Sequence, residues 1–279
     1  MLPISALPLL LPNRLRGLLF DLDDTLLDHS RLSEAAYSAL FRLREAGFEC
    51  YAVTGRPAGW AAVIVNQWPI QGAVAENGAI AYHTDEDGLH ALDPVPAPER
   101  RRRQQLLAAL CVDIQNEFPE LVPADDVSLR RTDFTYDIGE HQLVPKDRVA
   151  QLRQFAETRG ATTLASSVHA HVSFDRMDKA AGVVRLIHTL TGLDPTAILS
   201  RYAFIGDSEN DASCFAAFRH SIGVRNLSGR PTVAPRFITA HERGKGFVEA
   251  AQALIEAGVN TRMLEPASAS TLPASTGRR

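Results

Sequence analysis

Apolar and polar positions follow two periods along this chain, and the order of the periods predicts the fold. Short apolar runs, which are typical of buried strands, occur at residues 15–20, 49–54, 72–75, 202–206 and 220–223. Between them lie segments with the apolar spacing of amphipathic helices, at residues 33–46, 58–66, 179–190, 210–218 and 247–257. Because strands that alternate with helices build parallel sheets covered on both faces, we predict an α/β fold with a doubly wound parallel-sheet core.

The middle of the chain shows a different pattern. Residues 94–98 read Pro-Val-Pro-Ala-Pro and form a stiff linker. Beyond it the pattern predicts a helix at 100–118, a strand at 128–137, a helix near 149–156 and a strictly alternating strand at 168–174. We therefore expect an inserted α+β domain at residues 82–174. The core is then discontinuous, at 13–81 and 175–260, and residues 1–12 and 264–279 are expected to be flexible termini.

Composition narrows the class of protein. The chain has 279 residues, 45% of them hydrophobic and 22% charged, as in a soluble globular protein. Its formal net charge of −4 favours neither nucleic acid nor an anionic membrane as a partner. The three cysteines form no paired framework, and the apolar N-terminus lacks the basic start of a signal peptide, so we expect a cytoplasmic monomer or homodimer. The run of four arginines at 100–103 is expected to be a solvated helix face.

Carboxylates follow the first predicted strand directly. Asp21 and Asp23 stand at or just beyond its carboxyl end, where open α/β sheets bind ligands. Two carboxylates so close together repel each other unless a cation lies between them, and a hard divalent ion with oxygen ligands is the natural partner. The alternative is an acidic turn that caps the next helix through Asp28 or Ser30. The motif alone leaves both readings open.

Three further motifs lie at the ends or starts of predicted elements. Thr54 and Gly55 end the second strand, before Arg56 and Pro57, and a hydroxyl with free amides at a helix start suits a phosphate. Lys179 begins a helix, where the macrodipole opposes a cation, which suggests a role in neutralising an anion.

The last of these motifs follows the strand at 202–206 and supplies a second acidic strand end. Asp207 and Asp211 lie four residues apart there, with Asn210 between them. An ordinary turn remains the alternative at 54–57, a solvated lysine at 179 and a helix cap at 207 or 208.

Taken together and in this order, the four motifs resemble the haloacid dehalogenase (HAD) superfamily of phosphatases, over roughly residues 15–254. The 124 residues at positions 55–178 leave room for the cap domain that the Cof-type branch carries between its second and third motifs. The segments Ala-Glu-Asn-Gly-Ala at 75–79 and Gly-Lys-Gly-Phe at 244–247 look most like mannosyl-3-phosphoglycerate phosphatases and related sugar-phosphate phosphatases. Asp24 departs from the Cof-type pattern, which usually has Gly there.

The resemblance implies a Mg²⁺-dependent phosphatase that hydrolyses a small phosphomonoester, such as a phosphosugar or phosphoglycerate, through an aspartyl-phosphate. Asp21 would be the nucleophile and Asp23 the general acid and base. Mg²⁺ would be held by Asp21, Asp207 and the backbone carbonyl of Asp23. Phosphate would contact Thr54, Gly55, Lys179 and Asn210, and Asp211 would orient Lys179 or a metal-bound water. The side chains expected as possible substrate contacts are Arg56, Asn77, Asp137, His169 and His171.

Two other functions fit the same motifs. A phosphosugar mutase of the superfamily would need a second phosphate clamp in the cap domain. A non-catalytic binding protein on the same fold would not need all four motifs to be filled, as they are here.

Overall fold

The core of the molecule is one mixed sheet. The computed structural model describes residues 1–10, 15–166, 168–227 and 231–264. Within these ranges, nine strands form the sheet in the order β1 (Leu2–Pro3), β13 (Phe237–Ile238), β12 (His220–Gly223), β11 (Tyr202–Gly206), β2 (Gly17–Phe20), β3 (Glu49–Val53), β4 (Gly72–Ala75), β5 (Ile80–Asp85) and β6 (Gly88–Leu92). Pairing is parallel from β1 to β4, and β5 and β6 add an antiparallel edge.

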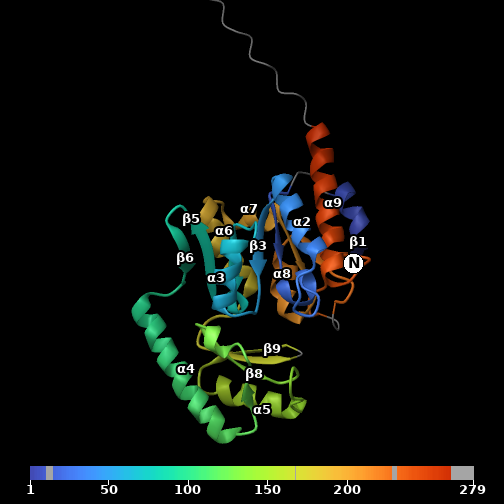
Figure 1. Cartoon of the computed structure of the whole chain (residues 1–279). Helices are drawn as coiled ribbons and strands as arrows, with labels where there is room; N and C mark the ends of the chain where they lie inside the picture. Colours follow the sequence, from blue (N-terminus) through green and yellow to red (C-terminus); the bar gives the residue numbers. More distant parts are fainter. Residues whose placement is uncertain (11–14, 167, 228–230, 265–279) are drawn as a thin grey trace, which may run out of the picture.

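Helices cover both faces of this sheet, as the alternating pattern predicts (Figure 1). Successive strand residues point to opposite faces, so Leu18 and Phe20 pack with one helical layer while Leu19 packs with the other. The first layer holds α1 (Leu7–Leu10), α2 (Glu34–Glu45), α3 (Ala58–Gln67) and α9 (Arg243–Leu264). The second holds α6 (Lys179–Thr191), α7 (Pro195–Arg201) and α8 (Ala212–Ala217). The doubly wound α/β core is therefore confirmed.

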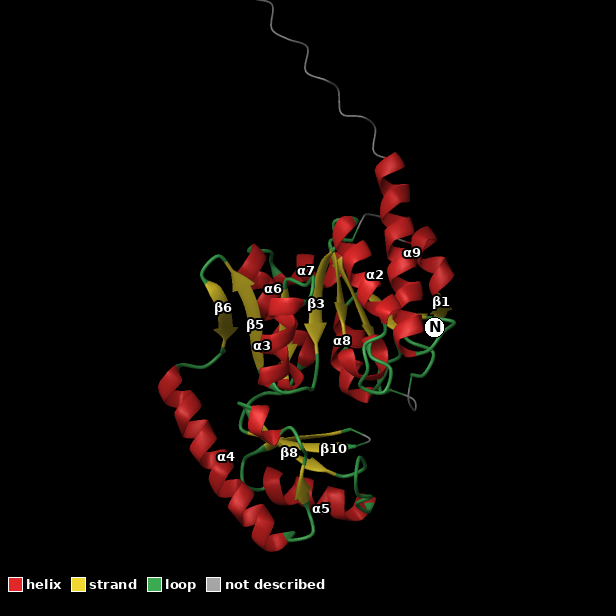
Figure 2. Cartoon of the chain, in the orientation of Figure 1, coloured by secondary structure: helices red, strands yellow, loops and turns green. Residues whose placement is uncertain are grey.

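A second, smaller sheet lies between β6 and α6 in the chain and forms the inserted cap domain. Its antiparallel order is β7 (Val122–Pro123), β8 (Asp133–Asp137), β10 (His169–Ser173) and β9 (Thr162–Ala165). The helices α4 (Ala97–Glu117) and α5 (Lys146–Glu157) pack on one face of it with their own apolar cluster. The cap sheet lies between α5 and the core, and β3 points toward it (Figure 2). The cap therefore stands over the carboxyl ends of the core strands.

The two faces of the cap sheet differ in polarity. Tyr136, Ala170 and Val172 pack against the cap helices. Alternation along the strands places the polar side chains of β8 and β10 on the opposite face, toward the core: Asp133, Thr135, Asp137, His169, His171 and Ser173.

Two predicted boundaries need correction. The cap was predicted to begin at residue 82, but β5 and β6 form a hairpin that pairs with β4 and extends the core sheet to Leu92. The N-terminus was predicted to be flexible, but β1 pairs with β13, and Ile4 and Leu7 are buried in the core. Both segments gain their order from strands far away in the sequence. The predicted flexible tail at 265–279 lies outside the described residues.

The arginine run at 100–103 was predicted to be a solvated helix face, and this prediction is wrong for part of the run. Arg100 is only 4% exposed, because its guanidinium lies between Asp93 of the first linker and Asp175 of the second. Arg103 contacts Asp175 as well, at 2.8 Å. These ion pairs join the two chain segments that connect the cap to the core. Within the run of four arginines, only Arg101 and Arg102 are exposed to solvent.

In the described part of the chain, no helix combines the length and the apolar character that crossing a membrane requires. Cys50, Cys111 and Cys214 are all free thiols.

The cap core generates a stability prediction. Leu152 is fully buried on α5, whereas Leu143 is 90% exposed in the loop before that helix. Leu152→Ala should lower the free energy of unfolding by about 2–5 kcal/mol, because it leaves a cavity. The matched Leu143→Ala should change it by less than about 0.5 kcal/mol. Urea unfolding of both variants checks this, and equal losses would contradict the packing described.

Candidate active site

Three parallel strands bring the motif residues together. β2 lies between β3 and β11, and Asp21, Thr54 and Asp207 follow the last residues of these three strands. Asp21 continues the extended backbone of β2 before the tight turn Leu22–Leu26. Because parallel strands end on the same edge of a sheet, these side chains converge there.

Lys179 is the buried cation of this edge. Its side chain is 1% exposed, and Nζ donates hydrogen bonds to Asp21 at 3.0 Å and to Asp211 at 2.7 Å. Burial by itself would lower the pKa of Lys179, but the charges of Asp21 and Asp211 outweigh it and the pKa is raised. The lysine therefore stays charged and holds two carboxylates that belong to distant parts of the chain.

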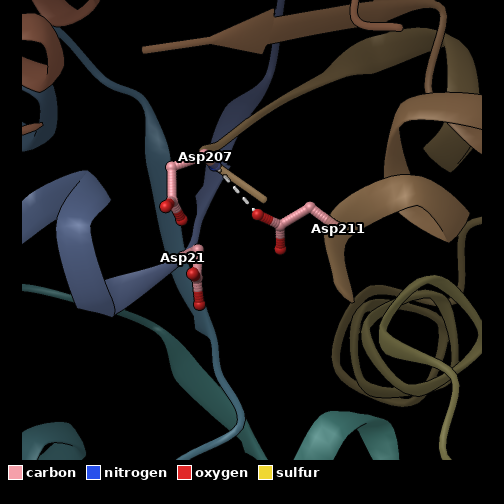
Figure 3. Close-up of side chains that lie close together, drawn as sticks. All are labelled: Asp21, Asp207 and Asp211. Atoms are coloured by element: carbon pink, nitrogen blue, oxygen red, sulfur yellow. Dashed lines mark hydrogen bonds between the residues drawn. The ribbon is translucent and has the colours of Figure 1, made fainter. Parts of the chain in front are cut away.

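Three carboxylates crowd the same place. Oxygen atoms of Asp21, Asp207 and Asp211 lie within 4.8 Å of one another, and Figure 3 shows Asp21 and Asp207 side by side at the ends of their strands. Burial raises the pKa of Asp21 to about 7, despite the Lys179 ammonium. Burial, together with the charges of Asp21 and Asp211, raises the pKa of Asp207 to about 9. The cluster therefore lacks positive charge.

Asp211 is already occupied by protein donors. One of its oxygens accepts from Lys179, and the other accepts from the backbone N–H of Asp207 at 2.9 Å, the dashed line in Figure 3. Among the described residues, the Asp207 carboxylate accepts only from the Thr25 hydroxyl, at 3.3 Å. Asp21 and Asp207 therefore keep free oxygens for a cation, while Asp211 supports the lysine.

Asp23 lies beside this cluster and is held by Arg56. The guanidinium donates through Nε and Nη2 to the Asp23 carboxylate, at 2.9 and 2.6 Å, and stacks over Trp60 with 4.2 Å to the ring centroid. The Asp23 side chain is still 48% exposed. Its carboxylate is therefore fixed in orientation and open to a ligand, and Arg56, expected only as a substrate contact, serves here to position it.

The turn after β3 is joined to the turn after β4. The buried Thr54 accepts a hydrogen bond from the Arg56 amide at 3.1 Å, and its backbone carbonyl accepts from the Asn77 N–H at 3.0 Å. The Asn77 side-chain amide is buried, yet neither its oxygen nor its nitrogen has a partner among the described residues. A Cβ on Gly55 would come within 3.0 Å of it. An unsatisfied amide at this edge suits a ligand.

The side chains of the remaining predicted contact residues bind other protein groups in this structure. The Asn210 side-chain oxygen accepts from Ser208 at 2.7 Å. In the cap, the Asp137 carboxylate accepts backbone N–H groups of residues 139–142, His171 contacts Asp133 at 2.8 Å, and His169 contacts Glu140 at 2.9 Å. Asp137 and His171 are thus engaged inside the cap, and roles for these residues in substrate binding stay predictions.

Comparison with known proteins indicates which family the chain resembles. Residues 18–94 match the family model of haloacid dehalogenase-like hydrolases. The phosphoglycolate phosphatase of Methanococcoides burtonii is 24% identical over 249 residues, 88% of this chain and 99% of that protein. These findings support a phosphoric monoester hydrolase.

Solved structures share the fold of this chain. The crystal structure of Thermoplasma acidophilum 0175 has a TM-score of 0.69 at 19% identity and covers 88% of this chain and 100% of its own. The sucrose-phosphatase from Synechocystis, solved with sucrose and phosphate, has a TM-score of 0.62 at 20% identity, with 86% and 98% covered.

The departure at Asp24 has a structural reason. Asp24 has φ of 52°, a left-handed conformation that favours Gly, and Asp tolerates it better than most residues. Its carboxylate accepts from Arg243 Nε at 2.9 Å, and its backbone carbonyl accepts from the Asn226 side chain at 2.9 Å. The start of α9 therefore holds the turn that follows Asp21. Neither this pairing nor the contact of Thr25 with Asp207 was predicted from the sequence.

The buried lysine generates a testable prediction. Lys179→Met should lower the free energy of unfolding at neutral pH and above by about 3–5 kcal/mol, because Asp21 and Asp211 lose their cation. The loss should shrink as the pH falls toward about 7, because Asp21 without Lys179 takes up a proton above the pKa of about 7 that it has in the wild type. Lys245→Met, at an exposed position of α9, is the matched control. Urea unfolding at several pH values checks this, and a pH-independent loss would contradict it.

Proposed function

We propose that this protein is a HAD-like, Mg²⁺-dependent phosphatase that hydrolyses a small phosphorylated metabolite through an aspartyl-phosphate on Asp21. The observation that carries the proposal is the buried contact of Asp21 with Lys179 beside Asp207. Lys179 bonds one oxygen of Asp21, so the second oxygen is left for attack on phosphorus. Covalent attack by a carboxylate divides one difficult displacement into two easier ones.

Asp23 transfers a proton in each of the two steps, as the acid in the first and the base in the second. In the first, the bond from Asp21 oxygen to phosphorus forms, the bond to the leaving oxygen breaks, and Asp23 gives that oxygen a proton. In the second, water attacks phosphorus, gives its proton to Asp23 and releases Asp21 and phosphate. Arg56 holds Asp23 in place for this exchange.

The phosphoryl oxygens need positive charge and donors. Lys179, the Thr54 hydroxyl and the Gly55 amide supply them at the strand ends, and Asn210 is a further donor. The unpaired Asn77 amide is positioned against Gly55 and is the best supported of the proposed substrate contacts.

The residues present fit a divalent metal ion. Asp21 and Asp207 have free carboxylate oxygens in a cluster whose raised pKa values show a shortage of positive charge. We propose these two side chains and the backbone carbonyl of Asp23 as ligands. When bound, Mg²⁺ screens the repulsion between the Asp21 carboxylate and the phosphate anion.

For the substrate we propose a small acid or sugar phosphate. The similar proteins named as phosphoglycolate phosphatases, and the sucrose-phosphatase that shares the fold, favour this class. A mutase would need a second phosphate clamp in the cap. The side chain of Arg130 in the cap is buried and already paired with Asp126 and Asp133. Because this guanidinium is not available for a second phosphate, its pairing favours the hydrolase. We also propose that the cap moves as one unit, at about residues 93–178, and that the enzyme is cytoplasmic.

Asp21→Asn should abolish turnover. The amide has nearly the shape of the carboxylate but is a poor nucleophile, so kcat should fall by more than about a hundredfold, a barrier increase of at least about 2.7 kcal/mol. Release of phosphate from a panel of sugar phosphates, phosphoglycolate and phosphoglycerates measures this. Asp87→Asn, in the exposed turn between β5 and β6, is the matched control. A variant that keeps more activity removes Asp21 from the nucleophile role.

Mg²⁺ should be required and should stabilise the protein. At about 100 times its Kd the ion should add about 2.7 kcal/mol to the free energy of unfolding. Asp207→Asn should lose most of this gain, and Asp87→Asn should keep it. Ca²⁺, which prefers more and looser ligands, should inhibit. Thermal unfolding with and without Mg²⁺, together with phosphate release in excess chelator, checks these effects; full activity in chelator would rule out the metal.

A further inference from the structure

Glu76 is a buried acid outside the reaction described above. It follows β4 in the turn Glu76–Gly78, has φ of 50° and is fully buried. A buried glutamate is uncommon unless it is paired, and a left-handed backbone is uncommon for a residue with a side chain. Glu76 combines a buried carboxylate with a left-handed backbone, and both are energetically unfavourable. The contacts that compensate for them therefore need an explanation.

The Glu76 carboxylate joins the core to the cap. In the core, one oxygen accepts from the backbone N–H of Ala58, at the start of α3, at 2.8 Å. From the cap, the Arg131 N–H donates at 2.8 Å and the Thr132 N–H at 2.6 Å, and the Thr132 hydroxyl also bonds the carboxylate. Four donors therefore meet one carboxylate, three of them from the cap.

The turn that carries Glu76 also contacts residues 54–56, the proposed phosphate-binding turn. The Glu76 N–H donates to the Arg56 carbonyl at 3.0 Å, so the turn that carries Glu76 is bonded to residues 54–56. Arg130, next to the Glu76 partners, donates from Nη1 to the Gly55 carbonyl at 3.2 Å and to Asp133 at 3.1 Å. Cap residues 130–132 thus contact the core beside Thr54.

We propose that Glu76 is a positioning residue that holds the cap domain against the phosphate-binding turn. This inference rests on the proposed phosphatase function. Arg100 holds the two linkers together, and the Glu76 contact is a further attachment of the cap to the core. The position of the cap and the geometry of residues 54–56 are thereby set together.

Glu76→Gln is the sharpest test, because it preserves the size of the side chain. All three N–H partners of Glu76 are obligatory donors, so an amide nitrogen in place of one carboxylate oxygen faces a donor and loses its bonds. Amide exchange at Arg131 and Thr132 should become at least about tenfold faster, and kcat/KM for the best monoester should fall by about tenfold or more.

Glu49→Gln is the matched control. Glu49 also accepts from several donors, Arg16, Tyr51 and Tyr202, but it begins β3 and so lies at the opposite end of the strand from Thr54. This variant should lower the melting temperature and leave kcat, KM and exchange at residues 131–132 unchanged. The contrast separates positioning from a loss of stability.

Thr132 provides a second pair of variants if Glu76→Gln does not fold. Thr132→Val keeps the shape but loses the hydroxyl bond, and should show the same changes in exchange and kcat/KM to a smaller extent. Thr132→Ser keeps the hydroxyl and should restore values close to those of the wild type.

The proposal is overturned if folded Glu76→Gln or Thr132→Val has unchanged kcat and KM, because Glu76 then only stabilises the fold. It is also overturned if amide exchange at residues 131–132 does not change. Wild-type protein that releases no phosphate from any monoester would instead contradict the proposed function, and the exchange measurement would still decide the contact.

Discussion

The buried ammonium of Lys179 is the interaction on which the active site depends. It lies at the start of α6, against the helix dipole, and binds Asp21 from β2 and Asp211 from the segment after β11. Without it, buried carboxylates from two strands would meet with no compensating charge. One cation therefore fixes the distance between elements that are 158 and 32 residues from it in the sequence. Even with this contact, burial and the neighbouring carboxylates keep the pKa values of Asp21 and Asp207 raised, which is a condition that favours a divalent ion.

Two turns with left-handed residues shape the rest of the site. Asp24 lies in the turn after β2, and Glu76 and Asn77 lie in the turn after β4. Each turn is held by partners that outweigh the cost of its backbone: Arg243 and Asn226 for the first, Ala58 and the cap backbone for the second. Strain of this kind persists where the surroundings determine it fully, and such places are often functional.

The cap is attached to the core by charge as well as by chain. Arg100 pairs with Asp93 and Asp175, so the two linkers are held together where they leave the core. Glu76 adds a contact between the core and Thr132 of the cap, near the turn at residues 54–56. The polar face of the cap sheet is directed at the strand ends while its apolar face packs on α4 and α5. The cap domain is therefore attached to the core by ion pairs and hydrogen bonds in addition to its two linkers.

The sequence by itself determined the order of strands and helices, the doubly wound core and the placement of Asp21, Thr54 and Asp207 at strand ends. These features depend on local periodicity and on a rule of parallel sheets, so a single chain suffices to predict them. Only the tertiary structure decided that the hairpin β5–β6 joins the core sheet, that Arg100 is buried and that Glu76 binds the cap. Burial and pairing depend on partners far away in the chain, and no local pattern of residues contains that information.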